Sequence, residues 1–261
     1  MSKIKLRNIY EHIPKVYFNK APYYNPNACH GVIKHPFMAG VIGGSQTGKT
    51  STAIDVIENC NCFERIEVYT KNKTEVVYKW LADVLGRNPD VFFCSSNLDD
   101  LKAPEEYDPK IQTLIIVDDF VLDKKLGNVP AIFQRGMKMN ISCLFISQSY
   151  HKIPKTDIRD NMNAVILKSI NSQKDFKALI GNFNLDKSMK ELKTMYDKAI
   201  INKPQDFMLI DPLEPNEKLR FRRNFSEIWT DGHWETAPEY KSSVETLAKE
   251  PKTKGKKQPK K

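Results

Sequence analysis

Short apolar runs recur along the middle of the chain, and each has the length of a buried strand. They cover residues 37–42, 66–70, 91–94, 113–117, 143–146 and 164–167. Helix-forming segments lie between or after these runs, over residues 51–58, 74–85, 129–139 and 172–200, and residues 97–110 have the composition of a polar loop. Strands that alternate with helices predict an α/β fold, with a mostly parallel central sheet and helices on both of its faces.

The two ends of the chain follow a different pattern. Residues 207–210 and 219–222 flank a proline-rich turn and predict a short antiparallel C-terminal hairpin. We expect four parts along the chain. They are an irregular N-terminal lead-in over residues 1–32, a main domain over residues 33–230, a C-terminal extension over residues 231–248 and a disordered lysine-rich tail over residues 249–261.

Composition narrows the class of protein. A chain of 261 residues is long enough for one large α/β domain. It contains no run of about 18 apolar residues and no signal-peptide core, so we expect a soluble protein with no membrane partner. The five cysteines have no zinc-type spacing, which favours reduced structural thiols. The histidines are scattered, and we assign none of them to a metal.

The net charge of +9 is concentrated at the C-terminus. Residues 249–261 hold seven lysines and one glutamate, a net charge of +6, which leaves +3 for residues 1–248. Such a tail cannot bury enough apolar surface to fold. A solubilising role and a role as a nucleic-acid-binding arm are equally compatible with its composition.

A phosphate-binding motif follows the first apolar run. Residues 43–50 match the motif G-x-x-x-x-G-K-[ST], whose fixed positions are Gly43, Gly48, Lys49 and Thr50. The variable positions are Gly44, Ser45, Gln46 and Thr47, and Ser51 continues into the predicted helix. The glycines allow backbone N–H groups to converge on phosphate oxygens, and the helix directs its positive end to the same point. Lys49 supplies an ammonium for the β- and γ-phosphates, and Thr50 supplies a hydroxyl for Mg²⁺.

Acidic and amide side chains follow two later strands. Asp118 and Asp119 end the run at 113–117, and Gln148 follows the run at 143–146. Since ligands bind at the carboxyl ends of parallel strands, we expect Asp118 to hold Mg²⁺ through water. Asp119 is then placed to deprotonate the attacking water, and Gln148 to sense the γ-phosphate.

The order of these motifs is typical of one class of P-loop ATPase. Predicted strands intervene between the P-loop and Asp118, and a second acid follows the first, as in the additional-strand class. A GTPase is disfavoured because its Asp-x-x-Gly motif requires glycine at position 121, which is Val121.

Together, these residues resemble the poxvirus-type genome-packaging ATPases of the FtsK–HerA superfamily, found in large double-stranded DNA viruses and virophages. The resemblance covers about residues 33–225. It rests on His35-Pro36-Phe37, the P-loop, Ile116–Phe120, Arg135 and above all the string from Phe145 through Gln148-Ser149-Tyr150 to Arg159 and Asn161.

The resemblance implies an ATP-driven motor, a ring of several identical subunits that pumps double-stranded DNA into a preformed capsid. ATP and Mg²⁺ would be its cofactors, and a capsid or portal-vertex protein its partner, in the virion or in a viral factory of the host cytoplasm. The resemblance implies that Lys49 contacts the phosphates and that Thr50 contacts Mg²⁺. It also implies that Asp118 is the metal-binding acid and that Gln148 is the sensor. Asp119 stands where many members have glutamate. Arg135 and Arg159 are alternative candidates for an arginine finger that reaches a neighbouring subunit, and either could instead form a structural ion pair.

Two other functions remain open on the sequence. One is a different ring motor, such as a helicase or a conjugation-type DNA pump. The other is a nucleotide-dependent assembly switch without translocation. A small-molecule kinase would need an acceptor pocket and a lid, for which the sequence gives no clear signal.

Overall fold

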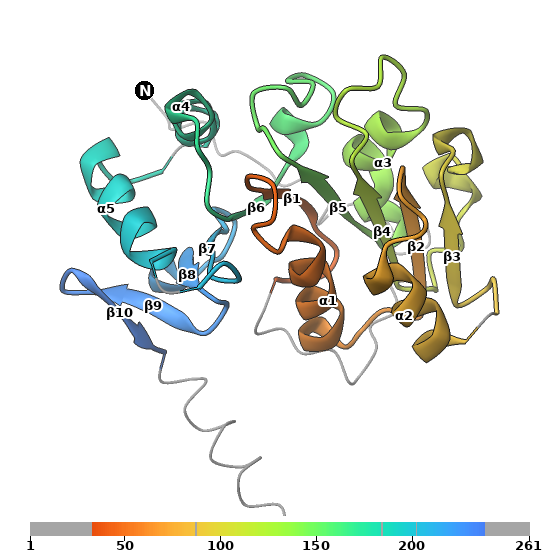
Figure 1. Ribbon diagram of the computed structural model, residues 1–261, viewed down its shortest axis with the longest axis horizontal. Helices are drawn as coiled ribbons and strands as arrows, with labels where there is room; N and C mark the ends of the chain where they lie inside the picture. Colours follow the sequence, from red (N-terminus) through yellow and green to blue (C-terminus); the bar gives the residue numbers. More distant parts are fainter. Residues whose placement is uncertain (1–32, 87, 184, 202, 238–261) are drawn as a thin grey trace, which may run out of the picture.

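Ten strands form a single sheet in the computed structural model, which describes residues 33–86, 88–183, 185–201 and 203–237. The order across the sheet is β10-β9-β8-β7-β6-β1-β5-β4-β2-β3 (Figure 1). The strands are β1 (Met38–Ile42), β2 (Arg65–Thr70), β3 (Phe92–Ser95), β4 (Thr113–Asp118), β5 (Ile141–Ser147), β6 (Ala164–Leu167), β7 (Met208–Ile210), β8 (Phe221–Arg223), β9 (Glu227–Thr230) and β10 (His233–Thr236). The six strands from β6 to β3 pair in parallel, and β7 to β10 add antiparallel pairs.

Helices cover both faces of the sheet, as the sequence predicts. They are α1 (Lys49–Cys60), α2 (Val76–Leu85), α3 (Val129–Arg135), α4 (Gln173–Asn182) and α5 (Met189–Ala199). The buried side chains divide into two clusters, one with α1 and α2 and one with α3, α4 and α5. In β4, Leu114 and Ile116 join the first cluster, whereas Ile115 and Val117 join the second. Because successive side chains of a strand point to opposite faces, a strand buried on both faces is apolar throughout.

The position of β5 defines the topological class. The strand that precedes the P-loop, β1, pairs with β5, and β5 in turn pairs with β4, which ends at Asp118. One strand therefore separates the P-loop strand from the strand that carries the acids. This arrangement confirms the predicted additional-strand α/β fold and brings the ends of β1, β5 and β4 into one row.

The C-terminal part is more extensive than the expected hairpin. The predicted pairing is confirmed, with Leu209 opposite Arg222 in β7 and β8. Two further strands, β9 and β10, continue the sheet and pair Trp229 with Trp234. Asp231 and Gly232 connect them, and both have positive φ angles (47° and 85°), as a two-residue type I′ turn requires.

One predicted helix is shorter than expected. The helix predicted over residues 129–139 ends at Arg135 and continues as a 3₁₀ turn over Gly136–Met139. Residues 172–200 are mostly helical, as predicted, and form the two helices α4 and α5. The loop over residues 97–110 contains two 3₁₀ turns and buries Leu98 and Tyr107. The expectations for residues 1–32, for residues 238–248 of the C-terminal extension and for the tail at 249–261 lie outside the described residues.

Candidate nucleotide-binding site

The P-loop turns sharply between β1 and α1 and is tied to both neighbouring strands. The Gly43 N–H donates to the carbonyl of Ser147 at 3.2 Å, and the Gly44 N–H donates to the carbonyl of Ser169 at 2.8 Å. Gly48 has φ of +74°, which favours glycine. A Cβ at Gly43 would lie 2.7 Å from Thr47 Oγ1 and 2.8 Å from Lys168 Cβ, so glycine is required there by close packing.

The amino end of α1 offers donors to a phosphate group. No side chain caps the first turn of this 12-residue helix, which begins at Lys49 and includes Thr50 and Ser51. The unsatisfied N–H groups and the helix dipole therefore point toward the P-loop. The Lys49 Nζ donates to the Gly44 carbonyl at 2.6 Å. The P-loop thus has the hydrogen-bond donors that a polyphosphate needs, and the Lys49 ammonium lies against the loop.

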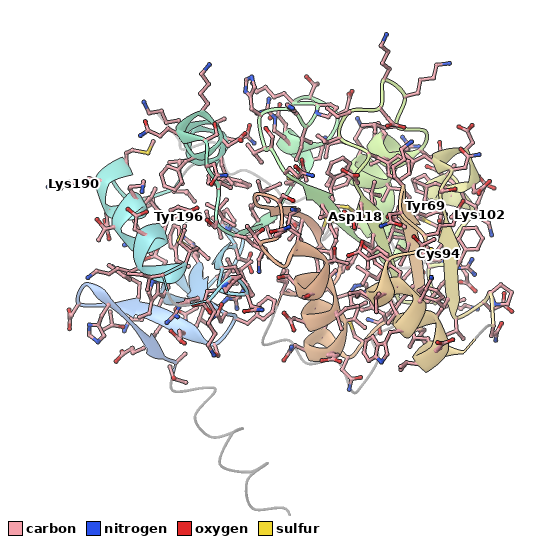
Figure 2. The ribbon with its side chains drawn as sticks, viewed as in Figure 1. Tyr69, Cys94, Lys102, Asp118, Lys190 and Tyr196 are labelled. Carbon is pink, nitrogen blue, oxygen red and sulfur yellow. The ribbon has the colours of Figure 1, made fainter. Side chains whose placement is uncertain are left out.

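Asp118 is the last residue of β4, Asp119 follows it, and both lie near the P-loop lysine. Figure 2 shows Asp118 at the level of the first turn of α1. Asp118 is buried, and the Tyr78 hydroxyl of α2 donates to its Oδ2 at 2.7 Å. Burial raises the pKa of Asp118 from 3.8 to about 6, against the opposing effect of the Tyr78 hydrogen bond. Asp119 is exposed and has φ of +66°, a conformation that aspartate tolerates better than most residues.

Lys49 lies within the electrostatic reach of both acids. Burial lowers the pKa of the Lys49 ammonium, and the charges of Asp118, Asp119 and Glu75 oppose that shift. The structure therefore brings the P-loop lysine and the two acids to one place, as the order of strands predicts. In addition it adds Glu75, the residue before α2, which sequence reasoning missed.

Gln148 follows β5 next to the P-loop. It is exposed, and the preceding Ser147 accepts a hydrogen bond from Gly43. The loop after Gln148 is fastened to α4 by the buried carboxylate of Asp175. The Asp175 Oδ1 accepts hydrogen bonds from Ser149 Oγ at 2.9 Å and from the His151 N–H at 2.7 Å. Gln148 thus lies between the P-loop and a loop that is anchored to a helix.

The two candidate arginines lie in different surroundings. Arg135 is exposed at the end of α3, and its Nε donates to Glu105 Oε1 at 2.7 Å. The next residue, Gly136, packs against Met38 and Ile141, the first residues of β1 and β5. Arg135 therefore lies near the amino-terminal ends of these strands, whereas the P-loop follows the carboxyl end of β1. The structure places Arg135 away from the P-loop and the strand-end acids and in a surface ion pair.

Arg159 lies in the loop that follows Gln148. Its guanidinium lies 5.2 Å from the centre of the Tyr150 ring. Its Nε is buried and has no hydrogen-bond partner among the described residues, as is also true of the Tyr150 hydroxyl. Unlike Arg135, Arg159 has no ion pair in the part of the chain that the structure describes.

A second lysine, Lys168, lies behind the P-loop and was not found from the sequence. It follows β6 and is fully buried, and its Nζ donates to Thr52 Oγ1 at 2.8 Å and to the Gln205 carbonyl at 2.7 Å. Burial lowers the pKa of Lys168 from 10.5 to about 8, although the charges of Asp55 and Asp206 raise it. A positive charge at the strand end was a visible signal, since Lys168 directly follows the apolar run at 164–167.

The donor set fits a magnesium ion held mainly by a nucleotide. Among the described residues, no group of three or more histidine, cysteine, aspartate or glutamate side chains could hold a metal ion. Thr50 and Asp118 supply one hydroxyl and one carboxylate. Mg²⁺ commonly binds one or two protein oxygens together with phosphates and water, so these two residues are sufficient. Over the same described ranges, no helix is both long and apolar enough to span a membrane.

Comparison with known proteins places the fold. No protein-family model matches the sequence, and no curated protein matches it. The genome-packaging NTPase B204 from Sulfolobus turreted icosahedral virus 2, in complex with AMPPCP, aligns with 10% identity and a TM-score of 0.51, over 73% of this chain and 98% of that one. The same NTPase in complex with sulfate aligns with 11% identity and a TM-score of 0.49, over 72% and 95%. EssC (ATPases 2 and 3) from Geobacillus thermodenitrificans aligns with 10% identity and a TM-score of 0.46, over 66% of this chain and 37% of that one.

At these identities the likeness concerns the fold. The chain has the fold of the P-loop ATPases. The genome-packaging NTPase B204 in complex with AMPPCP shares this fold.

Proposed function

We propose that this protein is an ATPase that hydrolyses ATP to ADP and phosphate with the help of Mg²⁺. One observation carries the proposal. The P-loop, Asp118, Asp119 and Gln148 meet at the carboxyl ends of the neighbouring strands β1, β4 and β5. A chance match to a short motif would not bring these separate segments together.

Each residue has a distinct part in the proposed reaction. The P-loop N–H groups and Lys49 bind the phosphates, and Thr50 and Asp118 hold Mg²⁺, which would neutralise phosphate charge when bound. Asp119 accepts the proton of the attacking water, and Gln148 contacts the γ-phosphate or that water. Asp119 is the only one of the two strand-end acids that is exposed, so it is free to contact water.

We infer further that turnover drives double-stranded DNA into a preformed viral capsid through a homo-oligomeric ring. The motif string from Gln148 to Asn161 and the fold shared with a genome-packaging NTPase support this reading. In the proposed arrangement, residues 33–230 are the motor, residues 231–248 extend it and residues 249–261 contact nucleic acid. A capsid or portal-vertex protein is the docking partner, in the virion or a viral factory.

Duplex DNA distinguishes the motor from its alternatives. The ATPase rate should rise when duplex DNA is added to the full-length protein, and a mass measurement should find a ring. Lys49→Ala is the control and should abolish turnover. An ATPase rate that does not change when duplex DNA is added would favour a nucleotide-dependent assembly switch. A helicase or another DNA pump would also respond to DNA but would not bind the capsid.

The identity of the general base has its own test. Asp119→Asn should slow hydrolysis about 10²-fold or more while ATP binding persists, because Thr50 and Asp118 still hold the metal. Glu75→Gln is the matched comparison, since Glu75 also acts on Lys49. If Glu75→Gln abolishes hydrolysis and Asp119→Asn does not, the base is Glu75 and the assignment of Asp119 is wrong.

A neighbouring subunit would complete the site in a ring. An arginine finger contributes about 10³-fold or more in rate, and Arg159 is the stronger candidate because it follows the sensor loop. Subunits with Arg159→Ala should be inactive alone and regain activity when mixed with Lys49→Ala subunits. The same mixture with Arg135→Ala tests the other arginine. If neither mixture recovers activity, neither residue acts in trans.

A further inference from the structure

Three exposed apolar side chains lie along one side of α2. Val76, Trp80 and Val84 follow one another at intervals of four residues, and they are 78%, 46% and 60% exposed. Residues four apart in a helix lie one turn apart on the same side, so the three form a stripe that we call the α2 face. Among the described residues, no other helix exposes three large apolar side chains.

The α2 face borders a cavity of about 290 Å³ between α1 and α2. Figure 1 shows these two helices next to one another on the same side of the sheet. The cavity is lined by Ser51, Ile54, Asp55, Val76, Val77 and Trp80. An exposed apolar stripe beside a cavity is typical of a surface that binds another polypeptide segment.

The N-terminal segment joins the body on this same side of the sheet. Ile33, the first described residue, is buried in one cluster with Tyr78 and Leu81, which form the inner side of α2. The thiol of Cys60, the last residue of α1, donates to the Ile33 carbonyl at 4.0 Å. Residues 1–32 therefore leave the body next to α1 and on the side of the sheet that carries the α2 face.

The segment is long enough to reach the α2 face. The helix α1 has 12 residues, so its two ends lie about 18 Å apart. The chain from Phe18 to Ile33 can span about 50 Å when extended. A tethered segment also has an effective concentration in about the millimolar range, which favours it over a second molecule for the same surface.

The sequence of the segment suits an apolar surface. Of the 15 residues from 4 to 18, eight are apolar or aromatic. They are Ile4, Leu6, Ile9, Tyr10, Ile13, Val16, Tyr17 and Phe18. Such a segment has enough apolar surface to gain free energy when it covers exposed valine and tryptophan side chains.

The charges of the segment and of the two helices are opposite. Residues 1–20 hold five lysine or arginine residues and one glutamate, a net charge of +4. Apart from the P-loop lysine, α1 and α2 hold Asp55, Glu58 and Asp83 against Lys79, a net charge of −2. Complementary charges around an apolar centre favour one partner and one orientation.

We propose that residues 4–18 bind the α2 face of their own chain and cover Val76, Trp80 and Val84. The apolar side chains of the segment pack against the face, and its basic residues lie near the acids of α1 and α2. The segment thereby supports the helix whose Tyr78 donates to Asp118. No step of the proposed ATP hydrolysis uses residues 4–18, so a failure of this proposal leaves that function intact.

Carbodiimide cross-linking of the unmodified full-length protein tests the contact directly. The reagent joins a lysine amine to a carboxyl group that it touches. Denaturing electrophoresis then separates chains linked to themselves, which keep the mass of one chain, from chains linked to one another. In the band of single-chain mass, peptide mass spectrometry should find links between lysines of residues 1–20 and the acids of α1 and α2. The absence of such links would overturn the proposal, and links found only between chains would assign the α2 face to the segment of a second copy.

The variant Val84→Lys distinguishes a covered face from an exposed one. Lysine is a good helix former and is favourable near the end of a helix that faces water, so an uncovered face tolerates it. Under a basic apolar segment, the new ammonium instead releases the segment. Trypsin should then cut after Arg7 about tenfold faster in the full-length variant than in the unmodified protein, because cleavage follows the population of the released segment.

Leu213→Lys is the matched control. Leu213 is 69% exposed, follows β7 and lies outside the α2 face, so this change should leave the rate of cleavage after Arg7 unaltered. An equal rate in all three proteins, or an equal rise in both variants, would overturn the proposal. If Val84→Lys does not fold, the cross-links in the unmodified protein still decide the question.

Discussion

Replacing Asp118 by asparagine should stabilise the protein in the absence of nucleotide and metal. Asp118 is buried, and in the folded state burial raises its pKa from 3.8 to about 6. The difference between these two pKa values corresponds to about 3 kcal/mol of unfavourable free energy for the ionised form at neutral pH. Asparagine has the same shape and no charge, and its side-chain oxygen still accepts a hydrogen bond from the Tyr78 hydroxyl.

The pH dependence gives this prediction its signature. Below pH 3.8 the carboxyl is protonated in both the folded and the unfolded state, so it contributes no difference. Between about 3.8 and 6 the unfolded state releases the proton that the folded state keeps, and the stability of the unmodified protein falls. Asp118→Asn should therefore gain little at pH 4 and about 3 kcal/mol at pH 7.

Urea unfolding in the presence of EDTA at pH 4, 5, 6 and 7 measures the effect. The gain at pH 7 should also appear as a rise in melting temperature of about 6–12 °C. The matched control is Asp119→Asn, whose side chain is exposed and should change stability by less than about 0.5 kcal/mol. A variant of Asp118 that is no more stable at pH 7, or equally stabilised at pH 4, would refute the reasoning. With ATP and Mg²⁺ at about 100 times the dissociation constant, the unmodified protein should gain about 2.7 kcal/mol and the variant much less.

Three further predictions follow from the surroundings of the site. The affinity for tripolyphosphate should fall as the pH rises through about 8, because Lys168 loses its proton there. Calorimetry on Lys168→Met should find weaker binding at pH 7 and no fall in affinity near pH 8. Asp175→Ala removes the acceptor for both Ser149 and His151, so urea unfolding should find a loss of about 3 kcal/mol, and ATP hydrolysis should slow. Deleting residues 249–261, which carry a net charge of +6, should flatten the dependence of log DNA affinity on log salt by up to about 0.9 per lost phosphate contact. An unchanged salt slope would mean that the tail does not contact DNA.

The arrangement of the candidate phosphate site could be predicted from the sequence because its motifs are contiguous. The fixed glycines and Lys49 occur within eight residues, and the acids directly follow an apolar strand. Because parallel strands end at a common edge, the position of Asp118 beside the P-loop follows from the pattern alone. The same reasoning placed Gln148 correctly at the end of the intervening strand.

The antiparallel end of the sheet was predicted only in part, although a local signal existed. Asp231-Gly232 between two short runs is a strong indication of a two-residue hairpin. The strands on either side have only four residues each and are mostly half-buried, so they lack the apolar runs that marked the central strands. Trp229 and Trp234 pack edge to face across the pair, with ring centres 5.2 Å apart.

Contacts between distant segments could not be predicted. Lys168 donates a hydrogen bond to Thr52, which is 116 residues earlier in the chain, and Tyr78 donates one to Asp118, which is 40 residues later. Lys168 was visible as a charge at the end of an apolar run, but its partner Thr52 was not, and the roles of Lys168 and Tyr78 depend on how the helices pack on the sheet. Glu75 was missed for the same reason, since only the packing of α2 places its charge near Lys49.

The contacts around α4 link the loop after Gln148 to the P-loop. On one side, Asp175 of this helix accepts hydrogen bonds from Ser149 and His151, directly after Gln148. At the other side, the segment that leads into the helix from Ser169 accepts a hydrogen bond from Gly44 of the P-loop. In the proposed reaction, a movement of Gln148 would reach α4 through the hydrogen bonds that Ser149 and His151 make to Asp175. Because Asp175 lies in α4 and Ser169 lies just before its N-cap, we expect α4, rather than the sensor loop alone, to carry the change between nucleotide states.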